Sequence, residues 1–124
     1  MTHEAKCPEM VEIRHKGYFR AVITVYGVAF QCRVKKDTTT ATIEVDYLSE
    51  GVALEYRSTA EWIRSQAQSQ PWAAEELAAH LAEHLAACIR NHRGYTARTF
   101  PKVTARIHFS EADGLLVTVT YTAV

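Results

Sequence analysis

The chain has 124 residues, which is the size of one domain and leaves no room for a second hydrophobic core. Its composition, 48% hydrophobic, 10% aromatic and 23% charged, is that of a globular protein and excludes a disordered or collagen-like chain. Fourteen basic and fourteen acidic residues cancel, which excludes long-range attraction to a nucleic-acid backbone or an anionic membrane as the basis of function. We expect a single domain over residues 1–124, in which residues 1–16 form a flexible or edge segment.

The N-terminus and the cysteines bear on cellular location. The first seven residues lack the apolar stretch of a signal peptide, and no apolar run is long enough to span a membrane. The sequence therefore predicts a cytoplasmic protein that does not bind a membrane. The chain has three cysteines, Cys7, Cys32 and Cys88. Their odd number and wide spacing argue against a disulfide framework and favour reduced thiols.

Hydrophobic patterns predict strands at both ends of the chain and helices between them. Residues 18–30 are rich in β-branched and aromatic side chains, and residues 40–47 alternate between apolar and polar. The spacing of Ser58 and Glu61 is that of a capping box and predicts a helix over about 59–65. Pro71 at a first helical position, the acidic pair Glu75–Glu76 and the apolar stripe over 77–89 predict a second helix, which Gly94 ends.

Alternation returns over residues 103–109 and 115–121, with a turn at 112–114 between them, and predicts a hairpin. The predicted order is ββααββ. This order indicates an α+β fold in which two helices cover one face of an antiparallel sheet.

Two features of the sequence could carry chemistry. His80, Glu83 and His84 have the spacing of an inverted zinc-protease motif, but a third ligand is missing and both histidines flank an apolar helix stripe, so we expect no metal. Cys32 is followed closely by three cations that would stabilise a thiolate. From these residues alone, a nucleophilic cysteine and a cysteine buried at a strand end are equally favoured.

Glu75 begins a Glu-x-Leu-Ala pattern on the second predicted helix. This pattern resembles the glutamate anchor of the tunnelling-fold (T-fold) superfamily, whose subunits assemble into rings and bind purine- or pterin-like rings at subunit interfaces. The segment from residue 32 to 47 resembles, without a gap, the nucleophile segment of 7-cyano-7-deazaguanine reductases, the QueF-like nitrile reductases of queuosine biosynthesis. The matching positions are Cys32, Val34, Ala41, Thr42, Ile43 and Tyr47. The resemblance implies a ring-forming homo-oligomer with interfacial sites for a small deazapurine, purine or pterin.

A third, weaker match resembles the NADPH-binding stretch of the same reductases. It covers Glu55, Arg57, Ser58 and Trp62. The resemblance implies that Arg57, Ser58 and Trp62 bind NADPH and that Glu55 and Ser58 help Glu75 to bind the substrate. It also implies that Cys32 attacks a nitrile to form a covalent thioimide, which two hydrides from NADPH then reduce to an amine.

Several positions depart from the reductase pattern. Thr39 stands where that family has a proton-donating aspartate, with Asp37 as the nearest substitute; we take both as candidate catalytic residues. The family's assisting histidine falls at Ala74, and the second lysine of its cofactor motif falls at Ala60. Three alternatives to the nitrile reductase therefore stay open. They are an amidine-forming QueF-like enzyme that acts on transfer RNA without NADPH, an aldolase-like pterin enzyme, and a T-fold binding protein without activity.

Overall fold

The sequence folds into six strands, two α-helices and one short 3-10 helix in a computed structural model that describes residues 6–99 and 101–124. In chain order the elements are β1 (Met10–Glu12), β2 (Phe19–Gln31), β3 (Thr38–Ser49), β4 (Val52–Leu54), α1 (Tyr56–Ala67), α2 (Ala74–Asn91), β5 (Lys102–Ser110), η1 (Ala112–Gly114) and β6 (Leu116–Ala123). The predicted ββααββ order is confirmed for the main sheet and the helices, and the short strands β1 and β4 are added to it.

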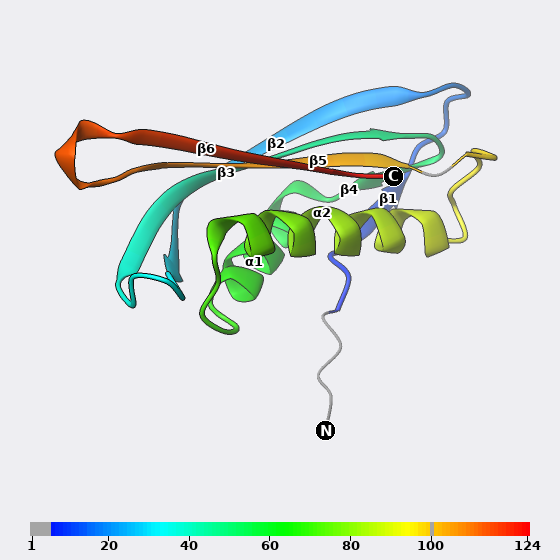
Figure 1. The fold of residues 1–124 in the computed structure, drawn as a ribbon. Coiled ribbons are helices and arrows are strands. Elements are labelled where there is room, and N and C mark those ends of the chain that lie inside the picture. The colour runs from blue at the N-terminus through cyan, green and yellow to red at the C-terminus, as the bar shows by residue number, and fades with distance from the viewer. Residues whose placement is uncertain (1–5, 100) are drawn as a thin grey trace.

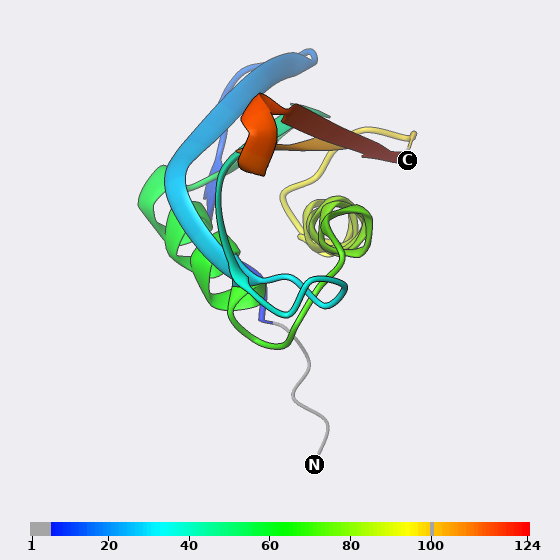
Figure 2. The same cartoon turned by 60° about the vertical axis from the view of Figure 1, so that its left-hand side comes forward.

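The main sheet has four antiparallel strands in the order β2-β3-β5-β6, and β1 pairs with β4 in a separate two-stranded sheet. Both helices lie on the same side of the main sheet (Figure 1). Helix α1 contacts β2, whereas α2 contacts β5 and β6, and the sheet curves around the helices (Figure 2). The predicted α+β fold with two helices on one face is therefore confirmed, while the ring-forming assembly stays a prediction.

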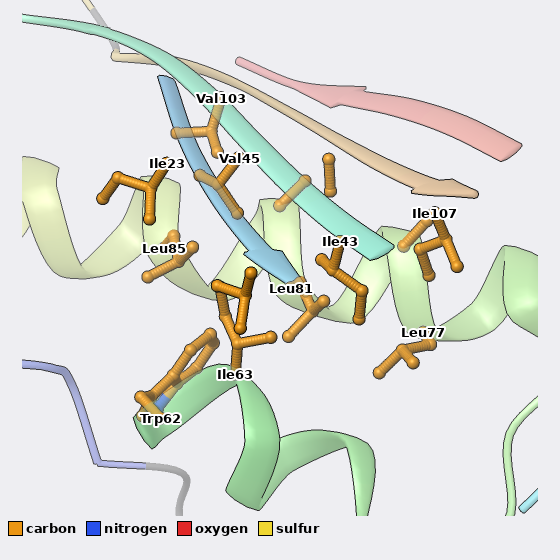
Figure 3. Packing of buried hydrophobic residues seen from close by; sticks show 14 of the residues in the cluster. Ile23, Ile43, Val45, Trp62, Ile63, Leu77, Leu81, Leu85, Val103 and Ile107 are labelled. Atoms are coloured by element: carbon orange, nitrogen blue, oxygen red, sulfur yellow. The ribbon is translucent and has the colours of Figure 1, made fainter. Parts of the chain in front are cut away.

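The hydrophobic core lies between the sheet and the two helices (Figure 3). Apolar residues from alternate positions of β2, β3 and β5 face the apolar stripes of α1 and α2, as the periods of a strand and a helix require. The side chains that Figure 3 labels are Ile23, Ile43, Val45, Trp62, Ile63, Leu77, Leu81, Leu85, Val103 and Ile107. This core fixes the face of the sheet on which a ligand site between strand and helix can form.

A bulge in β2 shifts which residues face the helices. The pairing of β2 with β3 is interrupted between Val25 and Val28, and Gly27 has a φ of 64°, a conformation that glycine adopts without steric cost. Arg64 of α1 donates hydrogen bonds to the carbonyl oxygens of Tyr26 (2.7 Å) and Gly27 (2.9 Å). Before the bulge the odd-numbered residues of β2 are buried, and after it the even-numbered ones are. If the alternation continues past the end of β2, Cys32 lies on the side of the sheet that faces the helices.

Two predicted helix starts were wrong by three residues each. Helix α1 begins at Tyr56: the side chain of Glu55 accepts hydrogen bonds from the backbone N–H groups of Arg57 and Ser58. Helix α2 begins at Ala74 instead of Pro71, and the side chain of Glu76 accepts the Ala73 N–H just before it.

The prediction of reduced thiols was wrong for two of the three cysteines. Cys7 and Cys88 form a disulfide that joins the N-terminal segment to α2, and Cys32 is the free cysteine. The same segment is held by backbone pairing, since the Glu9 N–H donates to Ser58 Oγ (2.8 Å) and the Glu9 carbonyl accepts from the Glu55 N–H (2.9 Å). An odd number of cysteines therefore did not exclude one disulfide between residues 81 positions apart.

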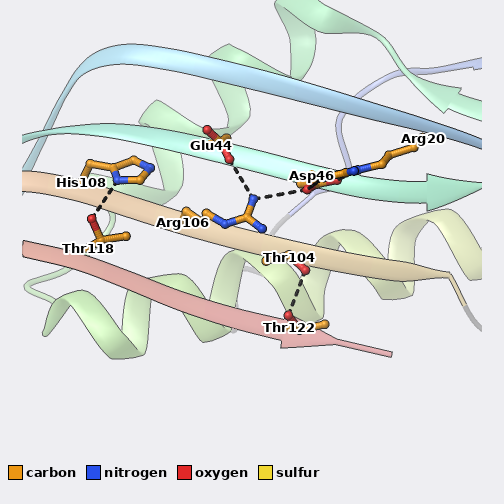
Figure 4. A network of polar contacts seen from close by, with 8 residues as sticks. All are labelled: Arg20, Glu44, Asp46, Thr104, Arg106, His108, Thr118 and Thr122. Atoms are coloured by element: carbon orange, nitrogen blue, oxygen red, sulfur yellow. Dashed lines mark hydrogen bonds and ion pairs between the residues drawn. The ribbon is translucent and has the colours of Figure 1, made fainter.

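The face of the sheet away from the helices carries a network of charged and hydroxyl side chains (Figure 4). Asp46 accepts hydrogen bonds from Arg20 (2.7 Å to Nε) and Arg106 (3.2 Å), and Arg106 also donates to Glu44 (2.8 Å). The hydrogen bond from Arg20, followed by that from Arg106, keeps the pKa of Asp46 below its usual value against the opposing effect of burial. In the described part of the chain, no helix is long and apolar enough to cross a membrane.

Candidate functional site

The candidate site is centred on Cys32, which lies directly after β2 at the start of a tight turn. The Cys32 N–H donates to the Asp37 carbonyl (2.7 Å), and the Lys36 N–H donates to the Cys32 carbonyl (2.8 Å). Lys36 adopts a φ of 59°, in the left-handed region, which closes the turn. The Cys32 side chain is partly buried. The turn therefore presents the thiol at the end of the sheet without enclosing it.

The segment before α2 is fastened beside Cys32 by backbone hydrogen bonds. The Trp72 N–H donates to the Gln31 carbonyl, and the Arg33 N–H donates to the Trp72 carbonyl, both at 2.9 Å, so Cys32 and Trp72 form a parallel bridge. Because Glu75 follows three residues after Trp72, this bridge brings the first turn of α2 to the strand end that carries Cys32.

A pocket of about 240 Å³ lies between this strand end, the start of α2 and the β5–β6 hairpin. Cys32, Thr39, Glu75 and Glu111 line it together with largely apolar side chains. The lining residues are Phe30, Cys32, Val34, Lys35, Thr39, Ala73, Ala74, Glu75, Phe109, Glu111, Val117 and Val119. A nucleophile, two acids and apolar walls in one small pocket are suited to a planar ring that carries an electrophilic group.

Two of the three cations near Cys32 are held by ion pairs. Arg33 Nε donates to Glu76 Oε1 at 3.0 Å, and Lys35 is paired with Glu111. The hydrogen bond from Arg33 is the main cause that lowers the pKa of Glu76, and the hydrogen bond from the Ala73 N–H acts in the same direction. These pairs direct much of the local positive charge toward carboxylates instead of the thiol, which weakens the electrostatic argument made from the sequence.

Of the predicted site residues, Cys32, Thr39 and Glu75 line the same pocket. Asp37 is exposed, does not line it, and contributes its backbone carbonyl to the turn. Sequence reasoning missed Glu111, because its approach to Lys35 depends on how the β5–β6 hairpin packs and no local motif marks it. The turn residues 112–114 were the one available signal, since they place Glu111 at a hairpin end.

The residues expected to bind NADPH lie elsewhere, on α1. Ser58 and Trp62 line a groove of about 730 Å³ that the residues of the N-terminal segment also line, and Arg57 does not line it. Ser58 accepts the Glu9 N–H, and Glu55 caps α1. None of these four residues lines the pocket of Cys32.

Trp62 itself is buried against the two histidines of α2. Its ring lies 5.6 Å from the ring of His84 and 6.4 Å from that of His80, measured between centroids. His80 contacts Trp72 as well and has Gln66 as a hydrogen-bond partner at 2.8 Å. Within residues 6–99 and 101–124 no three histidine, cysteine or acidic side chains are grouped as a metal site. The aromatic cluster accounts for the histidine spacing as packing between helices.

The molecule combines a curved antiparallel sheet, two helices on its concave face and a pocket between a strand end and a helix start. No family model matches the sequence, and no curated protein matches it. Among solved structures, the fold is similar to that of the archaeosine synthase QueF-Like in its apo form, with a TM-score of 0.61 and 18% sequence identity over 89% of this chain and 96% of that chain. The chain therefore has a fold like that of this QueF-like protein, and the resemblance read from the two motifs is confirmed for the fold.

Proposed function

We propose that this protein binds a 7-deazaguanine-like ring through Glu75 and adds the thiol of Cys32 to a nitrile carbon on that ring. The observation that carries the proposal is that Cys32 and Glu75 line one pocket, although they lie 43 positions apart in sequence and belong to different elements. The carboxylate of Glu75 can accept two N–H groups from the edge of a guanine-like ring. Phe30 and Phe109 provide apolar walls of the pocket.

The proposed bond-forming step is a nucleophilic addition. The Cys32 thiolate forms a C–S bond to the nitrile carbon while one electron pair of the triple bond moves to nitrogen, which takes up a proton to give a neutral thioimide. The thioimide is common to a nitrile reductase and to an amidine-forming enzyme, so the proposal covers the step that both share. An archaeosine synthase as structural neighbour supports this shared step and leaves the fate of the thioimide open between reduction and amidine formation.

The residues on α1 fit NADPH poorly. Ser58 is engaged by the Glu9 N–H, and the ring of Trp62 is covered by His80 and His84. Of the described residues that line the groove beside them, Lys6 is the only lysine or arginine. A dinucleotide with several phosphates needs more positive charge than one lysine supplies in a groove that Glu61 also lines. We therefore assign NADPH no role in the proposed step. Whether the protein oxidises NADPH when the nitrile is present is measured separately.

A second candidate function is ring binding without covalent chemistry. The observation that favours it is the pairing of Arg33 with Glu76 and of Lys35 with Glu111, which satisfies cations that could otherwise stabilise a thiolate. In this case Glu75 would still bind a purine or pterin ring, and Cys32 would line the pocket as a small apolar side chain.

The decisive experiment exposes the protein to 7-cyano-7-deazaguanine and measures intact mass. We expect an adduct with the mass of the whole ligand in the wild type and none in Cys32→Ala, which should still bind 7-deazaguanine in calorimetry. Glu75→Gln should lose about 2 kcal/mol of ring affinity, roughly thirtyfold, because a charge-assisted pair is lost. The matched control is Glu76→Gln, the next acid on α2, which does not line the pocket. Ring binding without an adduct would favour the second candidate, and no ring binding would refute both.

A further inference from the structure

We propose that Lys35, held by Glu111, donates the proton that the nitrile nitrogen needs when Cys32 adds to the carbon. This inference rests on the proposed function and deepens it. The sequence offers no good donor at the expected place, because Thr39 replaces an acid and a threonine hydroxyl is a poor acid near neutral pH. Asp37 does not line the pocket.

The position of Lys35 carries the inference. Among the described residues that line the Cys32 pocket, Lys35 is the only cation. It belongs to the same turn as Cys32, three residues further on, and its ammonium is paired with the carboxylate of Glu111 from the end of β5. The Lys35 side chain is 50% exposed and that of Glu111 is 24% exposed, so solvent can reach the pair.

The other two nearby cations are placed differently. Arg33 is turned to Glu76, on the outside of α2, and neither Arg33 nor Lys36 lines the pocket. A guanidinium would also be a poor proton donor, because it is not deprotonated in proteins. Of the three cations in the turn, Lys35 is thus the one that lines the pocket of Cys32, where it is paired with Glu111.

The proton transfer balances. As the C–S bond forms, one π electron pair of the nitrile becomes a lone pair on nitrogen, and that nitrogen takes a proton from Lys35 Nζ. The N–H electron pair stays on Nζ, so the thiolate and the ammonium are consumed together and give a neutral thioimide and a neutral amine. Glu111 stays ionised throughout. Water then returns a proton to the amine, which its exposure permits.

Three other titratable groups share the pocket with Lys35 and have separate roles in the proposal. Cys32 of the turn supplies the sulfur that attacks, Glu75 of α2 is the proposed anchor of the ring, and Glu111 of the hairpin pairs with the ammonium of Lys35. The proton is therefore left to Lys35.

The test measures the rate of adduct formation by quenched-flow mass spectrometry at saturating 7-cyano-7-deazaguanine. We expect Lys35→Met to slow the reaction about a hundredfold or more while it leaves the affinity for 7-deazaguanine unchanged. Lys35→Arg should be slow as well, because it keeps the charge without a transferable proton. Lys36→Met, one residue further along the turn and outside the pocket, is the matched control and should react at the wild-type rate.

Glu111→Gln tests whether the ion pair positions Lys35 for this role. It keeps Lys35 and removes the partner carboxylate, so the rate of adduct formation should fall, and Glu111→Asp, which keeps the charge, should recover part of it. A wild-type rate in Lys35→Met, Lys35→Arg or Glu111→Gln would overturn the donor and leave the thioimide proposal standing. A wild type that binds the ring and forms no adduct would overturn the thioimide proposal and this inference together.

Discussion

The Cys7–Cys88 disulfide gives the sharpest prediction about stability, and Cys7→Ala is the variant that tests it. Cys7 is exposed whereas Cys88 is 5% exposed, so the substitution at Cys7 removes the bond without changing the side chain that α2 buries. The backbone hydrogen bonds of Glu9 and the pairing of β1 with β4 remain. We therefore expect the variant to fold with the same secondary structure.

The expected loss of stability follows from the length of chain that the disulfide closes. For the 81 positions between the two cysteines, the chain-entropy relation gives about 4.5 kcal/mol as an upper figure, and measured disulfides contribute about 2–4 kcal/mol. In a domain of 124 residues, each kcal/mol corresponds to about 4 °C in Tm. We expect Cys7→Ala to lower the free energy of unfolding by about 3 kcal/mol and Tm by about 10 °C.

Urea unfolding with and without dithiothreitol measures this effect. The reductant should lower the midpoint of the wild type to that of Cys7→Ala and leave the variant unmoved, which separates the disulfide from general effects of the reagent. Iodoacetamide should modify one thiol in the unfolded, unreduced wild type and three after reduction, since the chain has three cysteines. Three reactive thiols before reduction, or a midpoint that ignores the reductant, would refute the reasoning.

Three further predictions concern groups away from the thiols. Asp46→Asn should lower the free energy of unfolding by about 1–3 kcal/mol, because it breaks a charge-assisted pair at a residue that is 8% exposed. Since folding lowers the pKa of Asp46, the wild type should lose this extra stability as the pH falls below about 4, and acid unfolding of both proteins measures the loss. Burial, and secondarily His84, lowers the pKa of His80, so protonation favours the unfolded chain and stability should fall as pH drops through about 6.5; Tm values at pH 7 and pH 5 should differ less in His80→Phe. Gly27→Ala should lower the free energy of unfolding by about 1–2 kcal/mol, because alanine is strained at a φ of 64°. A steric clash would not contribute, since an added Cβ would meet no atom within 4 Å, and a urea midpoint equal to that of the wild type would contradict this prediction.

The fold could be predicted from the sequence where local patterns decide it. Alternation over residues 40–47 and 103–109 gives strands whose apolar faces meet one core, and the apolar stripe over residues 77–89 gives the buried face of α2. The helix starts were less predictable. The sequence favours Ser58 as the residue that caps α1, but the side chain of Glu55, three residues before it, accepts the first N–H groups of the helix. Which of the two residues caps the helix depends on the path of the chain after β4.

The candidate site was predictable in part for the same reason. Cys32 and Glu75 were marked by motifs, but their meeting depends on the bridge between Cys32 and Trp72, which no pattern in either segment encodes. The Lys35–Glu111 pair and the Cys7–Cys88 bond join residues 76 and 81 positions apart. Such contacts follow from tertiary packing, so composition and spacing could suggest the participating residue types without pairing them.

The bulge at Gly27 explains how the sheet can serve both the core and the pocket. Ile23 and Val25 face the helices before the bulge, and Val28 and Phe30 do so after it, so two consecutive residues between them break the alternation. Without that break, continued alternation would place Cys32 on the opposite face from Glu75. Arg64 fastens the bulge to α1 through two carbonyl oxygens. The face that the thiol takes is thus set five residues upstream by a local change of register, and a variant that removes the bulge should lose thiol reactivity toward a bound ring, because the thiol would then lie on the face opposite Glu75.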